Sequence, residues 1–166
     1  MADPILGLAL ELPSQADVIA LIEALDAYQQ ALYPPESNHL LDMAAFDQTE
    51  VLFAVARTDG AAVGCGAAVM TRDGAGERYG EIKRMMVDPA WRGQGLGYAL
   101  LGFLEAELIK RGIFRARLET GVRQPAAQRL YVRSGYCATG PFGDYVSDPL
   151  SLFFAKDLTV GKTAAA

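Results

Sequence analysis

A glycine-rich stretch with one arginine, Arg92-Gly93-Gln94-Gly95-Leu96-Gly97, has the residue types that bind a phosphate. It lies between an extended segment, Glu81 to Val87, and an amphipathic pattern that begins at Leu96. Because glycine has no Cβ, consecutive backbone N–H groups can approach a ligand closely. At a helix start these groups lack helical partners, and the macrodipole favours an anion there. The stretch therefore predicts a pyrophosphate cradle with Arg92 as a fixed cation, although a packing turn would use the same glycines.

Two common phosphate motifs do not fit the sequence. A dinucleotide fingerprint needs its third glycine where Tyr98 stands. The tail Gly161-Lys162-Thr163 is similar to the end of a Walker loop, but Lys156 stands where that loop needs its first glycine. The spacing that remains, Arg92-x-x-Gly95-x-Gly97, resembles the acetyl-coenzyme A (acetyl-CoA) signature of the GNAT superfamily of N-acetyltransferases.

A second stretch carries the same resemblance. Ala127-x-x-Leu130-Tyr131-x-x-x-Gly135-Tyr136 resembles the second motif of the family, with Gln124 in place of the usual asparagine. The resemblance extends from about Ile5 to Leu158. It implies that acetyl-CoA is bound by Met86, Val87, Arg92, Gly93, Gln94, Gly95, Leu96, Gly97, Tyr98 and Gln124.

The chemistry of such an enzyme needs a base and an acid. An amine of pKa about 10 is almost fully protonated at pH 7, so it must lose a proton before it attacks a thioester. The resemblance implies that Glu81 is this general base and that Tyr131 protonates the departing thiolate. Glu119 on the neighbouring strand is the rival base or an anchor for a substrate ammonium, and Glu81 could instead only pair with nearby cations. A backbone N–H near Met86 or Val87 would polarise the thioester carbonyl.

The prediction of a binding site for the acceptor substrate rests on the resemblance alone. Tyr33 to His39 falls where GNAT proteins form the acceptor wall. With Leu118 to Gly121 and Gly140 to Tyr145, it resembles a bacterial subgroup described as amino-acid or auxin-type acetyltransferases. A small zwitterion or acid would be held by Glu36, His39, Arg84, Glu119 and Tyr145.

The implied reaction is direct transfer of an acetyl group from acetyl-CoA to a primary amine of a small molecule, in a ternary complex. Two alternatives stay open: a protein or peptide N-acetyltransferase, and a non-catalytic sensor of acyl-CoA. The panel of amines that accept the acetyl group would separate the first alternative, and a lack of any acceptor would indicate the second.

Periodicity and turn residues predict the elements that must position these groups. Apolar spacing after a Ser14 N-cap predicts a helix that ends before Pro34, and Thr58-Asp59-Gly60 predicts a hairpin. The order β-α-β-β-β-α-β-α-β-β predicts an α/β fold of the GNAT type, a mixed sheet of about six or seven strands with helices on both faces. The predicted strands are Ile5–Glu11, Val51–Arg57, Ala62–Thr71, Tyr79–Val87, Ile113–Glu119, Tyr136–Gly140 and Leu150–Lys156. The further predicted helices are Leu40–Phe46, Leu96–Leu108 and Gln124–Ser134.

Length, charge and cysteine usage narrow the class of protein. The 166 residues indicate one domain, residues 1–158, with a flexible tail at 159–166. A net charge of −5 without a basic run argues against nucleic acid, and no apolar run is long enough to span a membrane. Cys65 and Cys137 have no metal-ligand spacing, so we expect no metal and reduced thiols in a cytoplasmic protein. A homodimer would suit so small and apolar a domain, although no local pattern specifies its interface.

Overall fold

The computed structural model describes residues 6–37 and 50–159. His39, the predicted helix from Leu40 to Phe46 and nearly all of the predicted tail lie outside these residues. The described elements are, in order, β1 (Leu6–Leu10), α1 (Ala16–Leu32), the 3-10 turn η1 (Pro35–Ser37), β2 (Val51–Thr58), β3 (Ala61–Arg72), β4 (Arg78–Val87), the 3-10 turn η3 (Pro89–Trp91), α2 (Leu96–Lys110), β5 (Arg115–Gly121), α3 (Pro125–Arg133), β6 (Cys137–Thr139) and β7 (Ser151–Asp157).

The strands of the described residues form one seven-stranded mixed sheet, in the order β1-β2-β3-β4-β5-β7-β6. β1 to β4 are antiparallel neighbours, β4 and β5 are parallel, and β7 lies antiparallel between β5 and β6. Asp59 and Gly60 join β2 to β3 with φ values of 49° and 85°, the left-handed pair that a tight hairpin turn needs. The predicted fold class is confirmed. β5 begins at Arg115 rather than Ile113, because the Ile113 N–H still bonds the Leu108 carbonyl at the end of α2.

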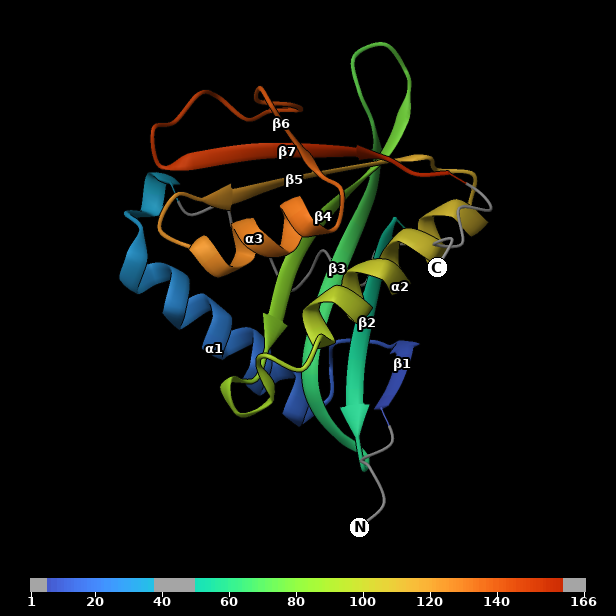
Figure 1. The fold of residues 1–166 in the computed structure, drawn as a ribbon, viewed down its shortest axis with the longest axis vertical. Coiled ribbons are helices and arrows are strands. Elements are labelled where there is room, and N and C mark those ends of the chain that lie inside the picture. Colours follow the sequence, from blue (N-terminus) through green and yellow to red (C-terminus); the bar gives the residue numbers. More distant parts are fainter. Residues whose placement is uncertain (1–5, 38–49, 160–166) are drawn as a thin grey trace.

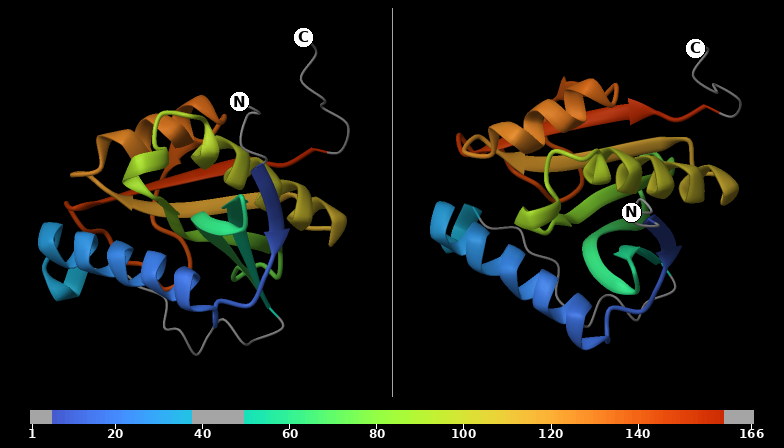
Figure 2. Two further views of the ribbon diagram at one scale, coloured as in Figure 1. Left: turned by 90° about the horizontal axis from the view of Figure 1, so that it is seen from below. Right: turned by 60° about the horizontal axis from the view of Figure 1, so that its bottom comes forward.

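Helices cover both faces of this sheet. Figure 2 shows α1 on one face and α2 with α3 on the other. The apolar residues of α1 pack on those of β2, β3 and β4, in a cluster that includes Val18, Ile22, Val55 and Cys65. α2 inserts fully buried leucines at 100, 104 and 108 into the second and larger cluster. Two cores on opposite faces therefore hold the sheet between them, as the predicted layering requires.

The start of α1 differs from the prediction. Gln15, not Ser14, is the N-cap residue, and its side chain makes no cap hydrogen bond. The first turn is satisfied by Asp17 instead, whose carboxylate accepts from the Val18 N–H at 2.9 Å. Asp17 also pairs with Arg57 at 2.7 Å, and Arg57 holds Glu11 at 3.0 Å. The carboxylate of Asp17, which is paired with Arg57, thus caps the first turn of α1 in place of the predicted Ser14 hydroxyl.

The feature of the sheet that makes room for a site is the separation of β4 from β5. Their parallel pairing comprises Gly80–Ala116, Glu81–Arg117 and Ile82–Leu118, and both strands continue beyond it. Figure 1 shows the two strands diverging toward α1. In the same region β4 carries a bulge against β3, where Arg84 has a φ of 58°. Bulges increase local twist, so this one helps to turn the end of β4 away from β5.

Candidate active site

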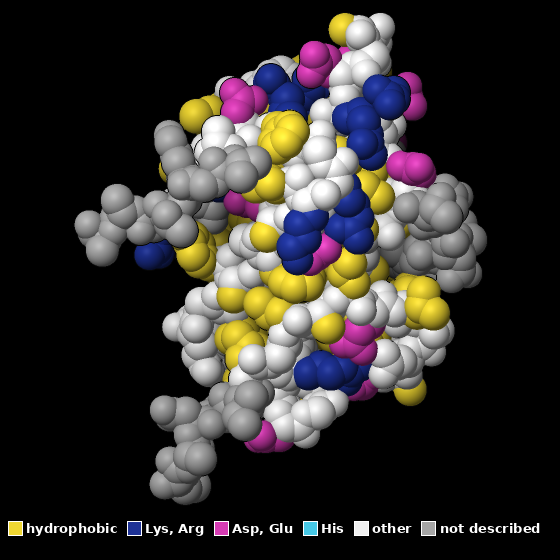
Figure 3. Space-filling model, turned by 90° about the vertical axis from the view of Figure 1, so that its right-hand side faces the viewer, with side chains coloured by type: hydrophobic (Ala, Val, Ile, Leu, Met, Phe, Trp, Pro, Cys, Tyr) yellow, Lys and Arg dark blue, Asp and Glu magenta, His cyan; other side chains and the backbone are white. Residues whose placement is uncertain are grey.

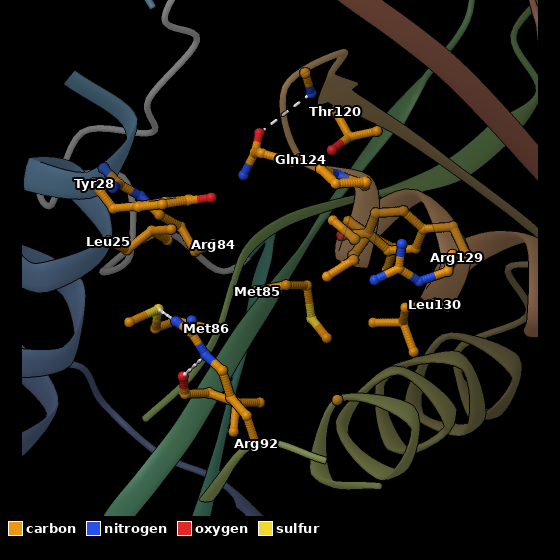
Figure 4. A pocket seen from close by; sticks show the side chains of 18 of the residues that line it. Leu25, Tyr28, Arg84, Met85, Met86, Arg92, Thr120, Gln124, Arg129 and Leu130 are labelled. Carbon is orange, nitrogen blue, oxygen red and sulfur yellow. Dashed lines mark hydrogen bonds between the residues drawn. The ribbon is translucent and has the colours of Figure 1, made fainter. Parts of the chain in front are cut away.

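A cavity of about 980 Å³ lies where β4 and β5 separate. Its walls come from α1, the end of β4, the glycine loop, the start of α2, the end of β5, and α3. Figure 4 shows Tyr28 of α1, Arg92 of the loop and Arg129 of α3 around it. Of the residues predicted to bind acetyl-CoA, Gln94 is absent from the lining, which includes Met86, Val87, Arg92, Gly93, Gly95, Leu96, Gly97, Tyr98 and Gln124.

The glycine loop has the backbone shape that an anion cradle needs. Gly93 and Gly95 have φ values of 77° and 81°, and Gly95 is the N-cap residue of α2. These left-handed conformations suit glycine, because a Cβ would clash with the following carbonyl. Arg92 is placed by a hydrogen bond from its Nε to the Val87 carbonyl, 3.1 Å away. The loop therefore turns the unpaired N–H groups of α2 toward the cavity beside a fixed cation.

A third glycine brings α3 against the start of α2. A Cβ built at Gly97 would lie 3.2 Å from the Leu130 side chain of α3. An alanine at position 97 would require the Leu130 side chain to move by a few tenths of an ångström. The close approach of α2 and α3 is what lets both helices line one cavity.

Tyr131 of α3 is buried and lines the cavity. Its ring packs edge-on against Tyr136, with 5.9 Å between the ring centroids. Burial raises the pKa of Tyr131 well above its ordinary value, and the charge of Glu119 raises it further. The phenol therefore keeps its proton at neutral pH, which suits a proton donor and not a proton acceptor.

Glu119 of β5 lies among three tyrosines that come from different elements. Its side chain lines the cavity. After burial, its negative charge is among the causes that raise the pKa values of Tyr33, Tyr131 and Tyr145. These residues belong to the end of α1, to α3 and to the loop between β6 and β7. Glu119 is therefore a carboxylate close to tyrosines from two cavity walls and from the loop between β6 and β7.

Glu81, the base implied by the family resemblance, occupies a different place. It is not among the cavity-lining residues. Its Oε2 accepts a hydrogen bond from the Tyr145 hydroxyl at 2.5 Å and pairs with Lys83 at 3.1 Å. Lys83 also donates to the Tyr145 hydroxyl at 2.8 Å, which closes a triangle of three side chains. The carboxylate of Glu81 is thus committed to Lys83 and Tyr145 in this state of the protein.

The other predicted acceptor residues are dispersed around the cavity. Arg84 lines it and forms an ion pair with Asp26 of α1. Glu36 is exposed and Tyr145 is half-buried in the triangle, and neither is among the lining residues. His39 lies outside the described residues. Of the five predicted acceptor residues, the structure therefore places Arg84 and Glu119 in the cavity wall.

Gln124, which replaces the usual asparagine, ties two walls together. Its Oε1 accepts from the Tyr33 hydroxyl and from the Gly121 N–H, each at 3.3 Å. The Tyr33 hydroxyl in turn accepts from the Arg123 N–H at 3.1 Å. Figure 4 shows Gln124 next to Thr120 at the end of β5. The longer amide thus connects the end of α1, the end of β5 and the start of α3.

Comparison with known proteins agrees with this geometry. Residues 18–136 match the acetyltransferase (GNAT) family. The chain is 46% identical over 155 residues to the IAA acetyltransferase of Azospirillum brasilense, covering 93% of this chain and 99% of that protein. The chain belongs to the GNAT family of acetyltransferases. The recognition, the enzyme class and the fold predicted from the sequence are thereby confirmed.

Two solved structures place this acetyltransferase among proteins of known fold. A protein from Klebsiella pneumoniae is 40% identical and superposes with a TM-score of 0.77, covering 93% of this chain and 99% of that one. The PaiA N-acetyltransferase from Thermoplasma acidophilum, in complex with coenzyme A, has a TM-score of 0.70 at 15% identity, covering 92% and 99%. Membership of the GNAT acetyltransferase family confirms the prediction of acetyl-CoA as the donor.

The cavity of this acetyltransferase fits that donor. Gly93 and Gly95 leave open space around the backbone, with no atom within 4 Å of a built Cβ, at the N-terminus of α2. The end of β4 and the end of β5 offer a separated pair of strands. No group of three or more His, Cys, Asp or Glu residues in the described ranges could hold a metal ion. In those ranges no helix is long and apolar enough to cross a membrane.

Several cavity residues were not singled out from the sequence, and three of them carry polar groups that bear on the site. Arg129 and Arg133 of α3 line the cavity, as does Tyr33 at the end of α1. The signal for the arginines was present, because their spacing of four places both on one face of a helix. Tyr33 was noted only as part of a loop, and its contact with Gln124 joins residues 91 positions apart. No local pattern could have indicated that contact.

Proposed function

We propose that this acetyltransferase transfers an acetyl group from acetyl-CoA to a primary amine of a small molecule by direct attack within the cavity. One observation carries the proposal: the glycine cradle, the protonated Tyr131 and the carboxylate of Glu119 line the same cavity. The relative from Azospirillum brasilense supports a small acceptor, because its name gives IAA as the molecule acetylated.

We assign the roles by position. Acetyl-CoA supplies the acetyl thioester. Glu119 accepts the proton of the acceptor ammonium, directly or through water, because it lies in the cavity wall. A backbone N–H of Met86 or Val87 donates to the thioester carbonyl oxygen as negative charge develops on it. Tyr131, whose pKa is raised by burial, gives its proton to the departing sulfur.

The choice between Glu119 and Glu81 is the sharpest test of these roles. With Glu119 as base, Glu119→Gln lowers kcat by about 10²–10⁴-fold and removes the acid limb of the pH–rate profile. Glu81→Gln then lowers kcat less and mainly raises the KM of the acceptor, because its carboxylate positions Lys83 and Tyr145. Glu77→Gln, a change in an exposed turn residue, is the matched control.

Steady-state thiol release with acetyl-CoA is the measurement, over a panel of amines, amino acids and short peptides. A loss of the acid limb in Glu81→Gln alone would return the base to Glu81, as the family resemblance implies. Peptides as the best acceptors would favour the protein or peptide alternative. If no acceptor in the panel gives thiol release above background, the result would support a non-catalytic sensor of acyl-CoA.

The proposal also covers the cellular compartment and the oligomeric state of the enzyme. We propose that it works in the cytoplasm as a homodimer. Cys65 and Cys137 are both free, and burial raises the pKa of the Cys65 thiol to about 12, so it stays protonated. Light scattering of the purified chain tests the dimer, and a single-chain mass would exclude it.

A further inference from the structure

Arg129 and Arg133 are unusual among the arginines of this chain. They lie one turn apart on α3, both are exposed, and both line the cavity. Neither makes a hydrogen bond or an ion pair with any other residue in the ranges that the structure describes. The arginines that do have such partners are Arg57, Arg72, Arg78, Arg84, Arg92, Arg111, Arg115, Arg117 and Arg123.

The absence of partners for this pair is unexpected from the composition. The chain carries more acidic than basic side chains, with a net charge of −5. Figure 3 shows one face of the molecule on which basic side chains border acidic ones. Two like charges at positions i and i+4 of a helix repel each other, so the α3 pair is unfavourable in the free protein. A bound anion would remove that repulsion.

The position of the pair shows which part of a donor it could reach. Leu130 lies between the two arginines in sequence and packs against Gly97 at the start of α2. The arginines are therefore on the wall next to the glycine cradle, but they belong to another helix. The cradle supplies backbone N–H groups for a pyrophosphate, with Arg92 on the β4 side, bonded to the Val87 carbonyl. A second anionic group beside the pyrophosphate would face α3.

We propose that Arg129 and Arg133 form a subsite for the 3′-phosphate of the coenzyme A ribose. This inference rests on the proposed function. A phosphomonoester carries a charge of about −1.5 to −2 at pH 7 and has three acceptor oxygens. Guanidinium groups bind such oxygens with paired, charge-assisted hydrogen bonds. The pair thus makes the enzyme selective for coenzyme A over the same donor without its 3′-phosphate.

The experiment compares acetyl-CoA with acetyl-dephospho-CoA, which lacks only the 3′-phosphate. In the unaltered enzyme we expect the KM of the dephospho donor to be at least about tenfold higher than that of acetyl-CoA. The reason is that one good charge-assisted hydrogen bond changes an affinity by about tenfold. Arg129→Ala with Arg133→Ala should raise the KM of acetyl-CoA to that of the dephospho donor. The double variant should no longer distinguish the two donors, and its circular dichroism spectrum and melting temperature show whether it is folded.

Binding without turnover provides the second measurement. Calorimetric titration with coenzyme A and with dephospho-CoA should show the same loss of preference in the double variant. Arg72→Ala is the matched control, because it removes the same charge from the exposed last residue of β3, which does not line the cavity. It should retain the full preference.

Two results would overturn the subsite. Equal affinity of the unaltered enzyme for the two ligands would show that no group recognises the 3′-phosphate. An equal loss of affinity for both ligands in the double variant would place the arginines on the pyrophosphate instead. A chain that binds coenzyme A with this preference but acetylates no amine would retain the subsite and overturn the proposed function.

Discussion

The two halves of the cavity are built in different ways. The donor half comes from two short and nearly continuous stretches, Arg92 to Gly97 and Gln124 to Arg133, and the backbone conformation of the first stretch shapes it. The acceptor half comes from Tyr33, Glu119 and Lys83 on three elements, held by side-chain contacts across the chain. A half fixed by local backbone geometry tolerates change elsewhere in the fold. A half fixed by distant side chains depends on the whole fold being correct.

The electrostatics of the halves differ as well. The donor half presents N–H groups and exposed cations, so it recognises anions in a solvent-accessible setting. The acceptor half places a carboxylate near buried phenols whose pKa values are raised. Glu119 and Lys83 both line the cavity, so the acceptor half presents one carboxylate and one cation beside these phenols.

Tyr131 lies where the halves meet, and after Glu119 its loss should have the largest effect on kcat. Tyr131→Phe removes the proton donor but keeps the ring that packs on Tyr136. We expect kcat to fall about 10²-fold, with the KM values of donor and acceptor nearly unchanged. Because the pKa of Tyr131 is raised, its deprotonation should not lower the rate of the unaltered enzyme below about pH 10.

The control for this variant is Tyr136→Phe, which removes a buried hydroxyl that donates to Glu105 at 3.4 Å. It should change thermal stability more than kcat. A full rate in Tyr131→Phe would assign Tyr131 to packing, and the acid would then have to be water. Steady-state kinetics with both substrates varied, over a range of pH, separate these outcomes.

The donor half could be predicted from the sequence for a physical reason. Glycines at 93, 95 and 97 predict a turn before an amphipathic helix, and the resemblance of Arg92-x-x-Gly95-x-Gly97 to the acetyl-CoA signature favours a cradle over a packing turn. The order of strands and helices followed in the same way from periodicity. The start of α1 was predicted less well, because Asp17, paired with Arg57, caps the helix and Ser14 does not. The contact between Asp17 and Arg57 joins residues 40 positions apart, so no local pattern could indicate it.

The acceptor half could not be predicted to the same degree. The sequence named Glu81 and Glu119 as rival bases, and only the fold shows that Glu81 is held by Lys83 and Tyr145. The hydrogen bond between Tyr33 and Gln124 joins two walls through residues far apart in sequence. Single-sequence patterns carry information on local conformation, whereas these contacts are set by how β4, β5 and α1 pack.

A change confined to the donor half should have the next-largest effect. Gly95→Ala places a Cβ at a φ of 81°, which strains the N-cap of α2 without any clash with a neighbour. We expect the KM of acetyl-CoA to rise about tenfold, because relaxation of the backbone would turn the N–H groups away from the phosphate. The acceptor KM should stay the same. Gly76→Ala, at a φ of 83° in an open turn, carries the same strain and should leave both KM values unchanged.

The loss of a single hydrogen bond in the acceptor half should have the smallest effect. The Ser37 hydroxyl donates to Asp148 at 2.5 Å and so joins η1 to the loop between β6 and β7. Ser37→Ala should raise the acceptor KM about threefold and leave the donor KM unchanged, since one such bond contributes roughly 0.5–1.5 kcal/mol. Ser134→Ala is the control, because its buried hydroxyl has no hydrogen-bond partner among the described residues. A shift in the donor KM instead would show that η1 positions the whole cavity, and the division into two independent halves would then fail.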